Sequence, residues 1–386
     1  MSSLSRIAAL VDALIAQPAH EQPRERARTL ARLAMEYAYA GLPLDGLHAV
    51  KEALSLATTH NLALERAEAL ASAAMCHHLR VDHMMSIACG FDAYQGFAAL
   101  NEYGRMGHQL ITLAAACRDL QAHDLAEAAL NGCLIIAERI NDKLLAARSH
   151  NVLGLTFREC QRFDEAEREF VLSRDCLIAL GEWLHVPKVT ANIGVLFRKR
   201  AEVAIAAGDD AQSEQLLQRA ITHMREGLQA ALSDDNKFEI ADKTGSIGQF
   251  YFLLNDFSTA RALVAQSLDM GQALKHARLI ADGYLWLGQI EMGAMQLVLA
   301  EHHLRAAIDR SRQAGLKSTQ QAAHLQLSKC YAAMARPHDA AAQAALSADL
   351  QAAFAQANLD AQRELRMMWH DRLSHHPMMA IKSADV

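Results

Sequence analysis

The chain of 386 residues is long enough for two or three ordinary domains or for one extended repeat array. Its 38 basic and 44 acidic residues give a net charge of −6, which indicates neither a nucleic-acid nor a membrane partner. Apolar residues make up 52% of the chain but aromatic residues only 5%, and just 6 prolines occur. An interior rich in Ala and aliphatic side chains with few prolines predicts closely packed helices. The seven cysteines follow no disulfide pattern, so we expect buried, reduced thiols and a cytoplasmic protein without a membrane span.

The first residues predict a capping helix. Leu4, Ile7, Val11 and Leu14 recur at helical spacing, and Asp12 interrupts the apolar run that a secretory signal would need. We therefore expect residues 3–17 to be helical and residues 1–20 to cap a repeat array, because the first unit of such an array otherwise exposes its stacking face.

Small residues recur in pairs with a period of 40 between residues 21 and 357. The two members of a pair are twelve residues apart, except in the fifth pair. The first members are Ala34, Ala74, Ala114, Gly154, Gly194, Gly248, Gly288 and Ser328, and the second members are Gly46, Ser86, Ala126, Ala166, Ser213, Ala260, Ala300 and Ala340. Such a pattern indicates two helices that approach closely in every repeat. It predicts eight helical hairpins near 21–60, 61–100, 101–140, 141–181, 182–235, 236–275, 276–315 and 316–357.

The fourth hairpin illustrates the expected unit. A first helix continues to Phe157, residues 161–164 form the turn, and a second helix begins before Ala166 and ends at Gly181, a residue suited to the position after a helix. In the sixth hairpin, residues Asn255 to Phe257 are predicted to form the corresponding turn.

The fifth hairpin departs from the period. Gly194 and Ser213 are 19 residues apart, and Ser213 and Gly248 are 35 apart, so that each interval has seven extra residues. Because seven residues are about two helical turns, we predict a protruding hairpin over about 187–232. The alternative is a pair of longer loops near 207–210 and 233–236.

These hairpins resemble the tetratricopeptide repeat (TPR) family. The resemblance rests on the small residue in the first helix, an aromatic at the turn (Phe163, Phe257), and Ala followed four residues later by a bulky residue, as in Ala166 with Phe170. It implies an all-α, right-handed α-solenoid. The period of 40 in place of 34, and the absence of the family's usual Trp and Pro from most repeats, depart from the pattern.

A narrower resemblance concerns the chain's later part. Forty-residue repeats are similar to the sensory TPR regions that precede bacterial diguanylate cyclase (GGDEF) domains, and residues 349–369 resemble the helix that leaves such a region. No GGDEF sequence follows here.

The sequence lacks the common catalytic and nucleotide-binding motifs, so we predict no enzyme activity and no cofactor. Cys76, His77, His78, His83 and Cys89 form the most metal-like cluster. Their spacing matches no known ligand pattern, and adjacent His77 and His78 point about 100° apart on a helix, so we expect surface histidines and buried thiols and no metal.

The repeat alignment predicts a basic strip on the inner face of the array. Its charged and imidazole members lie four residues after or six residues before the first small residue of a pair, and Asn151 lies beside them. The strip consists of Arg118, Arg158, Arg198, His108, Arg148, Lys188 and Asn151. The planar guanidinium group of arginine forms paired hydrogen bonds with carboxylate or phosphate groups. In the alternative reading, the arginines only pair with neighbouring acids such as Asp119, Glu159 or Glu202.

The leading hypothesis is a non-enzymatic, bacterial signalling scaffold or regulator that binds an acidic or extended peptide segment of a protein partner, or a small anionic ligand, with this strip. The alternative is a ligand-sensing input module of a cyclic-di-GMP-related system without its catalytic domain. Nucleic acid and membranes are not expected as partners.

The C-terminal part predicts one long helix. An Ala-rich stretch from Pro337 continues into Leu365 and Trp369, and we expect residues 358–374 to cap the array or to join two copies of the chain through exposed Met and Trp side chains. Residues 375–386 are expected to be disordered.

Overall fold

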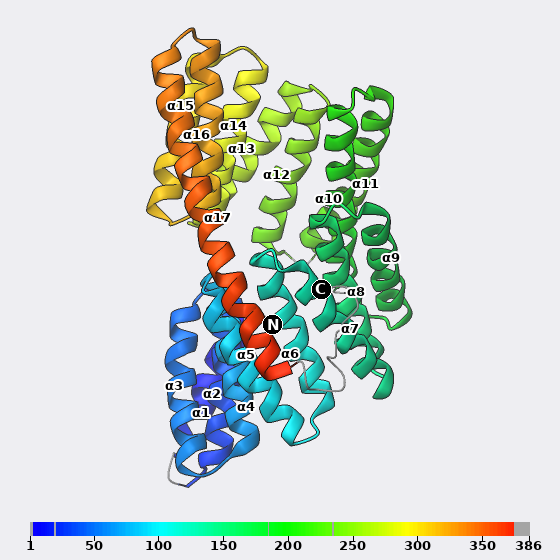
Figure 1. Ribbon diagram of the computed structural model, residues 1–386, viewed down its shortest axis with the longest axis vertical. Coiled ribbons are helices and arrows are strands. Elements are labelled where there is room, and N and C mark those ends of the chain that lie inside the picture. Colours follow the sequence, from blue (N-terminus) through cyan, green and yellow to red (C-terminus); the bar gives the residue numbers. More distant parts are fainter. Residues whose placement is uncertain (1–2, 19–20, 184, 234, 374–386) are drawn as a thin grey trace. The chain divides into compact units, whose positions relative to one another are not determined.

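The computed structural model describes residues 3–18, 21–183, 185–233 and 235–373, and these residues are almost entirely helical (Figure 1). No strand occurs among them, and none of their helices is long and apolar enough to cross a membrane. The helices are α1 (Ser3–Ile15), α2 (Pro23–Tyr39), α3 (Pro43–Thr59), α4 (Ala63–Leu79), α5 (His83–Ala99), α6 (Tyr103–Asp119), α7 (His123–Arg139), α8 (Lys143–Glu159), α9 (Phe163–Ala179), α10 (Val186–Ala206), α11 (Asp210–Ser233), α12 (Lys237–Leu253), α13 (Phe257–Ala273), α14 (Ala277–Gly293), α15 (Leu297–Gln313), α16 (Lys317–Ala333) and α17 (Pro337–Leu373). The predicted all-α array of TPR-like hairpins is confirmed.

The 40-residue period comes from two helices of 17 residues and two turns of three residues. At each turn, one residue adopts the left-handed backbone conformation that ends a helix, as Gln161 does with a φ of 60° and Gly181 with a φ of 71°. The next amide then bonds back into the helix, as Arg162 N–H does to the Phe157 carbonyl at 2.9 Å. Phe163 is the first residue of α9, so this turn is shorter than the sequence predicted.

The small residues lie where the two helices of a hairpin touch. Ser86 Oγ donates to the Ala74 carbonyl and Ser328 Oγ to the Ala340 carbonyl, both at 2.8 Å. A methyl group at Gly154 would lie 2.6 Å from the Phe170 ring, so only glycine fits there without displacing the ring.

The fifth hairpin is long, as predicted, but one of its marker residues is not the predicted one. Helix α10 has 21 residues and α11 has 24, and only residues 207–209 separate them. Gly194 lies against Ala220, whose carbonyl would be 3.0 Å from a methyl group at Gly194, and Ser213 is not its partner. All fourteen extra residues therefore lie between Gly194 and Ala220, where they lengthen both helices of the hairpin.

The chain divides into two compact units. The described residues of the first unit lie within 1–176 and 358–386, and those of the second unit lie within 177–357. Helix α17 contributes residues to both, and we call its described part within the first unit, residues 358–373, the C-terminal segment.

The C-terminal segment buries two of its apolar side chains. Leu365 is completely buried and Trp369 is 3% exposed, with the indole edge-on to the Phe91 ring of α5 at a centroid distance of 6.0 Å. The expectation of an exposed Trp is therefore wrong, because the chain's own α5 covers it. Met367 does remain 62% exposed. The expected disordered tail lies outside the described residues.

Candidate functional site

A cluster of charged and imidazole side chains lies at the turns of three successive hairpins in the first unit. It draws its members from the last turn of α4, the start of α5, and the ends of α6 and α8. We call it the polar cluster: His78, His83, Arg118, Asp119, Arg158 and Glu159. The 40-residue repeat places equivalent helix ends beside one another, which brings side chains from distant sequence positions together.

Arg118 is the centre of this cluster. Its guanidinium donates to Asp119 Oδ1 at 3.0 Å, and its Nε lies 3.3 Å from Glu159 Oε1. The second contact is an ion pair and not a hydrogen bond. Arg118 Nε is therefore buried without a hydrogen-bond acceptor. Arg158 reaches the same Glu159 oxygen at 3.9 Å. Two arginines of the predicted strip are thus brought together around one carboxylate.

Glu159 is the most accessible member of this group. Its side chain is 36% exposed, compared with 16% for Arg118 and 17% for Arg158. Burial raises the pKa of the Glu159 carboxyl above its ordinary value, although the charges of both arginines act in the opposite direction. This carboxylate is therefore incompletely solvated and only loosely held by its partners.

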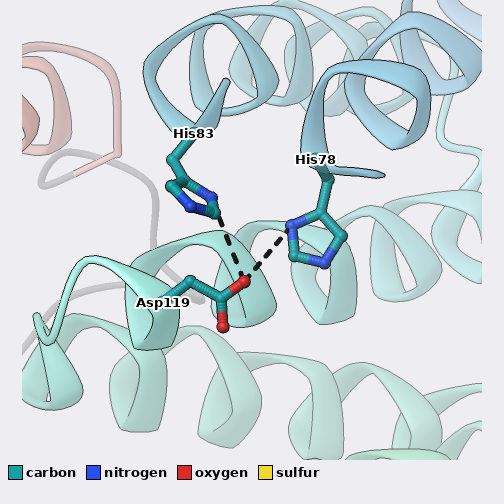
Figure 2. A group of neighbouring side chains, drawn as sticks. All are labelled: His78, His83 and Asp119. Carbon is teal, nitrogen blue, oxygen red and sulfur yellow. Dashed lines mark ion pairs between the residues drawn. The ribbon is translucent and has the colours of Figure 1, made fainter. Parts of the chain in front are cut away.

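Two histidines, His78 and His83, face one carboxylate oxygen of Asp119 (Figure 2). The distance to Asp119 Oδ2 is 3.7 Å from His78 Nδ1 and 3.9 Å from His83 Nδ1. Burial lowers the pKa of His78, and the attraction of Asp119 does not reverse this shift. The imidazole of His78 is therefore neutral near pH 7.

His108 and Arg148 of the predicted strip also lie close together in the first unit. Burial lowers the pKa of His108, and the positive charge of Arg148 on α8 lowers it further. Arg148 acts on Tyr39 at the end of α2 as well, where its charge opposes the effect of burial, which raises the pKa of that phenol. Asn151 is half-buried one turn after Arg148.

The remaining two strip residues belong to the second unit. Arg198 is bound to Glu202 at 2.5 Å, and Lys188 is exposed near the start of α10. Arg118, Arg158 and Arg198 thus all pair with the acids that the sequence offered as their alternative partners.

The C-terminal segment binds next to the polar cluster. Gln362 Nε2 donates to the carbonyl of Leu120, the residue that follows Asp119, at 2.6 Å. Arg366 forms a bidentate ion pair with Asp124, and Arg372 contacts Asp92 at 2.5 Å. Neither aspartate could be predicted from the sequence, because single acids on helix surfaces carry no periodic signal.

No family model matches the chain, and no curated protein matches it. Solved structures do resemble it. The apo form of the quorum sensor NprR from B. thuringiensis has a TM-score of 0.59 at 14% identity, over 84% of this chain and 88% of that chain. The Rap conjugation gene regulator of plasmid pLS20, in complex with the Phr* peptide, gives 0.57 at 11% identity, over 94% and 95%. Apo RapI gives 0.57 at 15% identity, over 75% and 98%. At these identities the likeness shows a shared TPR-like helical-repeat fold.

Proposed function

We propose that the chain is a non-enzymatic, TPR-type regulator that binds an acidic or extended peptide segment of a protein partner. A fold alone does not determine a function. The fold does support this proposal, because the similar pLS20 regulator is in complex with a peptide and NprR is a quorum sensor. A cytoplasmic signalling role agrees with the proposal.

The observation that carries the proposal is the buried Nε–H of Arg118, which lacks an acceptor. An unsatisfied buried donor is costly, and the cost is greater for a charged group. A carboxylate or phosphate of a ligand would accept this hydrogen bond if it took the place of Glu159. Arg158, which now shares Glu159, would then contact the same anion.

The other strip residues would extend this contact. Arg148, His108 and Asn151 belong to the same compact unit as Arg118, and we assign them to the binding of further ligand groups. Arg198 and Lys188 would serve in the second unit. A small anionic ligand at Arg118 and Arg158 would use the same chemistry, and competition between it and a peptide would reveal a shared site.

The alternative of a sensory input module for a cyclase has no further support. None of the solved structures reported above is described as such a region. Dimerisation through the C-terminal segment also stays a prediction, and it would have to use exposed residues such as Leu359 and Met367, since Leu365 and Trp369 are covered within the first unit.

Affinity capture from a bacterial lysate tests the proposed function. The full chain should retain a specific protein at low salt and lose it as the salt concentration rises, because screening weakens contacts between charges. The Arg118→Ala/Arg158→Ala variant should capture much less of it. The matched control is Arg174→Ala, which removes an arginine from α9 that pairs with Asp175. Equal capture by all three proteins would contradict the proposal.

A further inference from the structure

His78, His83 and Asp119 have the arrangement of a metal-binding group. One ligand atom from each lies within 4.8 Å of the other two. Both Nδ1 atoms are buried without a hydrogen-bond partner, and both face the same carboxylate oxygen (Figure 2). Buried imidazole nitrogens that lack partners are uncommon, because each loses its bonds to water without replacement.

The distances suit coordination after a small adjustment. Two atoms that each lie 2.0–2.1 Å from a tetrahedral zinc ion are about 3.3 Å apart. The observed Nδ1–Oδ2 distances of 3.7 and 3.9 Å exceed this by roughly half an ångström. The two imidazole rings are inclined at 61° with centroids 6.0 Å apart, so they do not stack, and small side-chain rotations can bring both nitrogens towards one point.

We propose that His78 Nδ1, His83 Nδ1 and Asp119 Oδ2 bind a divalent transition-metal ion, of which zinc fits the donor set best. Imidazole and carboxylate ligands are typical of protein-bound zinc, and three protein ligands leave a fourth position for water or for a donor atom of another molecule. This site goes beyond the proposed peptide binding and does not depend on it. It also departs from the sequence-based expectation of no metal.

Arg118 prepares the carboxylate for this role. It holds Asp119 Oδ1 at 3.0 Å and leaves Oδ2 directed at the histidines, which is how outer hydrogen bonds orient metal ligands. Its positive charge opposes cation binding, but Asp119 and Glu159 together balance Arg118 and Arg158. The side chains of His78, His83 and Asp119 are 18%, 16% and 30% exposed, so the group lies near the protein surface even though both Nδ1 atoms are buried.

Neighbouring residues do not complete the site. Cys76 is fully buried, and burial raises the pKa of its thiol to about 11, so it stays protonated at neutral pH. Its Sγ lies 3.7 Å from the Ala34 carbonyl. His77 lies 3.3 Å from Asp82. The three proposed ligands come from three helices, so a bound ion would tie the ends of α4 and α6 to the start of α5.

Zinc titration of the metal-free full chain tests this proposal. Binding is measured by competition with a coloured zinc chelator, and cobalt is added in a parallel experiment because a tetrahedral cobalt site gives strong visible absorption. The test variant is His78→Gln/His83→Gln. The matched control is His302→Gln/His303→Gln, which removes another neighbouring pair of imidazoles, with ring centroids 5.7 Å apart. Circular dichroism of the metal-free proteins shows that each variant is folded.

The wild-type chain and the control variant should each bind one equivalent of zinc. The test variant should fail to bind this equivalent or should bind it at least tenfold more weakly. Zinc should raise the Tm of the first two proteins only, because a ligand stabilises the state that binds it. Asp119→Asn should weaken binding in the same way. The proposal is overturned if the folded test variant binds zinc as tightly as the wild type, or if the wild type binds no equivalent that the histidine substitutions remove.

Discussion

Arg366 of the C-terminal segment and Asp124 of α7 form a bidentate ion pair, with N–O distances of 2.7 and 3.0 Å. The two residues are 242 positions apart in the sequence. Together with the buried Trp369, this pair holds a helical segment on the first unit. The first unit therefore presents a surface that accommodates an amphipathic helix with basic residues.

Trp369→Ala should release the C-terminal segment. The substitution removes a large side chain packed against Phe91, and comparable buried truncations cost about 3–5 kcal/mol. Hydrogen exchange should accelerate over residues 358–373. Met367→Ala is the control, because that side chain is 62% exposed and its loss should leave exchange unchanged. Identical protection in both variants would show that Trp369 does not hold the segment.

Acid should loosen the same segment through Asp124. Burial favours the protonated carboxyl, but the hydrogen bonds and charge of Arg366 outweigh it and lower the pKa of Asp124 below its ordinary value of 3.8. The stabilisation is therefore complete above about pH 4 and is lost as the pH falls towards the lowered pKa. Exchange of the segment should rise on acidification in the wild type and be already elevated at pH 7 in Asp124→Asn. A wild-type segment that stayed equally protected at both pH values would contradict this assignment.

Gly154→Ala should destabilise the protein by about 1–3 kcal/mol, because the added methyl group would lie 2.6 Å from the Phe170 ring. Gly104→Ala is the matched control in a neighbouring hairpin. There a methyl group would meet only Ile140 at 3.8 Å, and alanine favours a helix by up to about 1 kcal/mol. Urea denaturation should give opposite signs for the two substitutions. A stabilising Gly154→Ala would refute the close approach of α8 and α9.

The metal-free chain should lose stability as the pH falls below about 6.5, partly through His78. Burial lowers the pKa of this imidazole in the folded state from its ordinary value of 6.5. Between that value and the lowered pKa, the unfolded chain binds a proton that the folded chain does not, so stability falls with pH. Thermal unfolding from pH 8 to 5 should show a smaller loss for His78→Gln than for the wild type. Superimposable pH profiles would argue against a neutral, buried His78.

The hairpins could be predicted from the sequence because close helix contacts demand small residues at regular intervals. Ala74 with Ser86 and Ser328 with Ala340 are such contacts. Ser213 was misassigned because it lies seven residues before Ala220, about two helical turns, and is also buried. Ala220 and Gly248 are 28 residues apart, which is also the interval between Ala166 and Gly194. This shared interval identifies Ala220 as the true marker residue.

The candidate site was only partly predictable. The repeat register correctly brought Arg118 near Arg158 and His108 near Arg148, because equivalent positions stack. It did not indicate that Asp119 and His83 lie beside His78, because neither residue occupies one of the repeat positions that define the strip. The docking of Trp369 on Phe91 joins residues far apart in the chain, and no local pattern records it.

Peptide selection on the full chain measures whether it prefers anionic peptides. Peptides enriched from a random displayed library are labelled, and their Kd is measured by fluorescence anisotropy. We expect enrichment of Asp- and Glu-containing peptides, whose affinity falls by about 10- to 100-fold in Arg118→Ala/Arg158→Ala because charge-assisted hydrogen bonds are lost. Arg174→Ala should bind them like the wild type. Enriched peptides without acidic residues, or an unchanged Kd in the double variant, would rule out anionic peptide binding by Arg118 and Arg158.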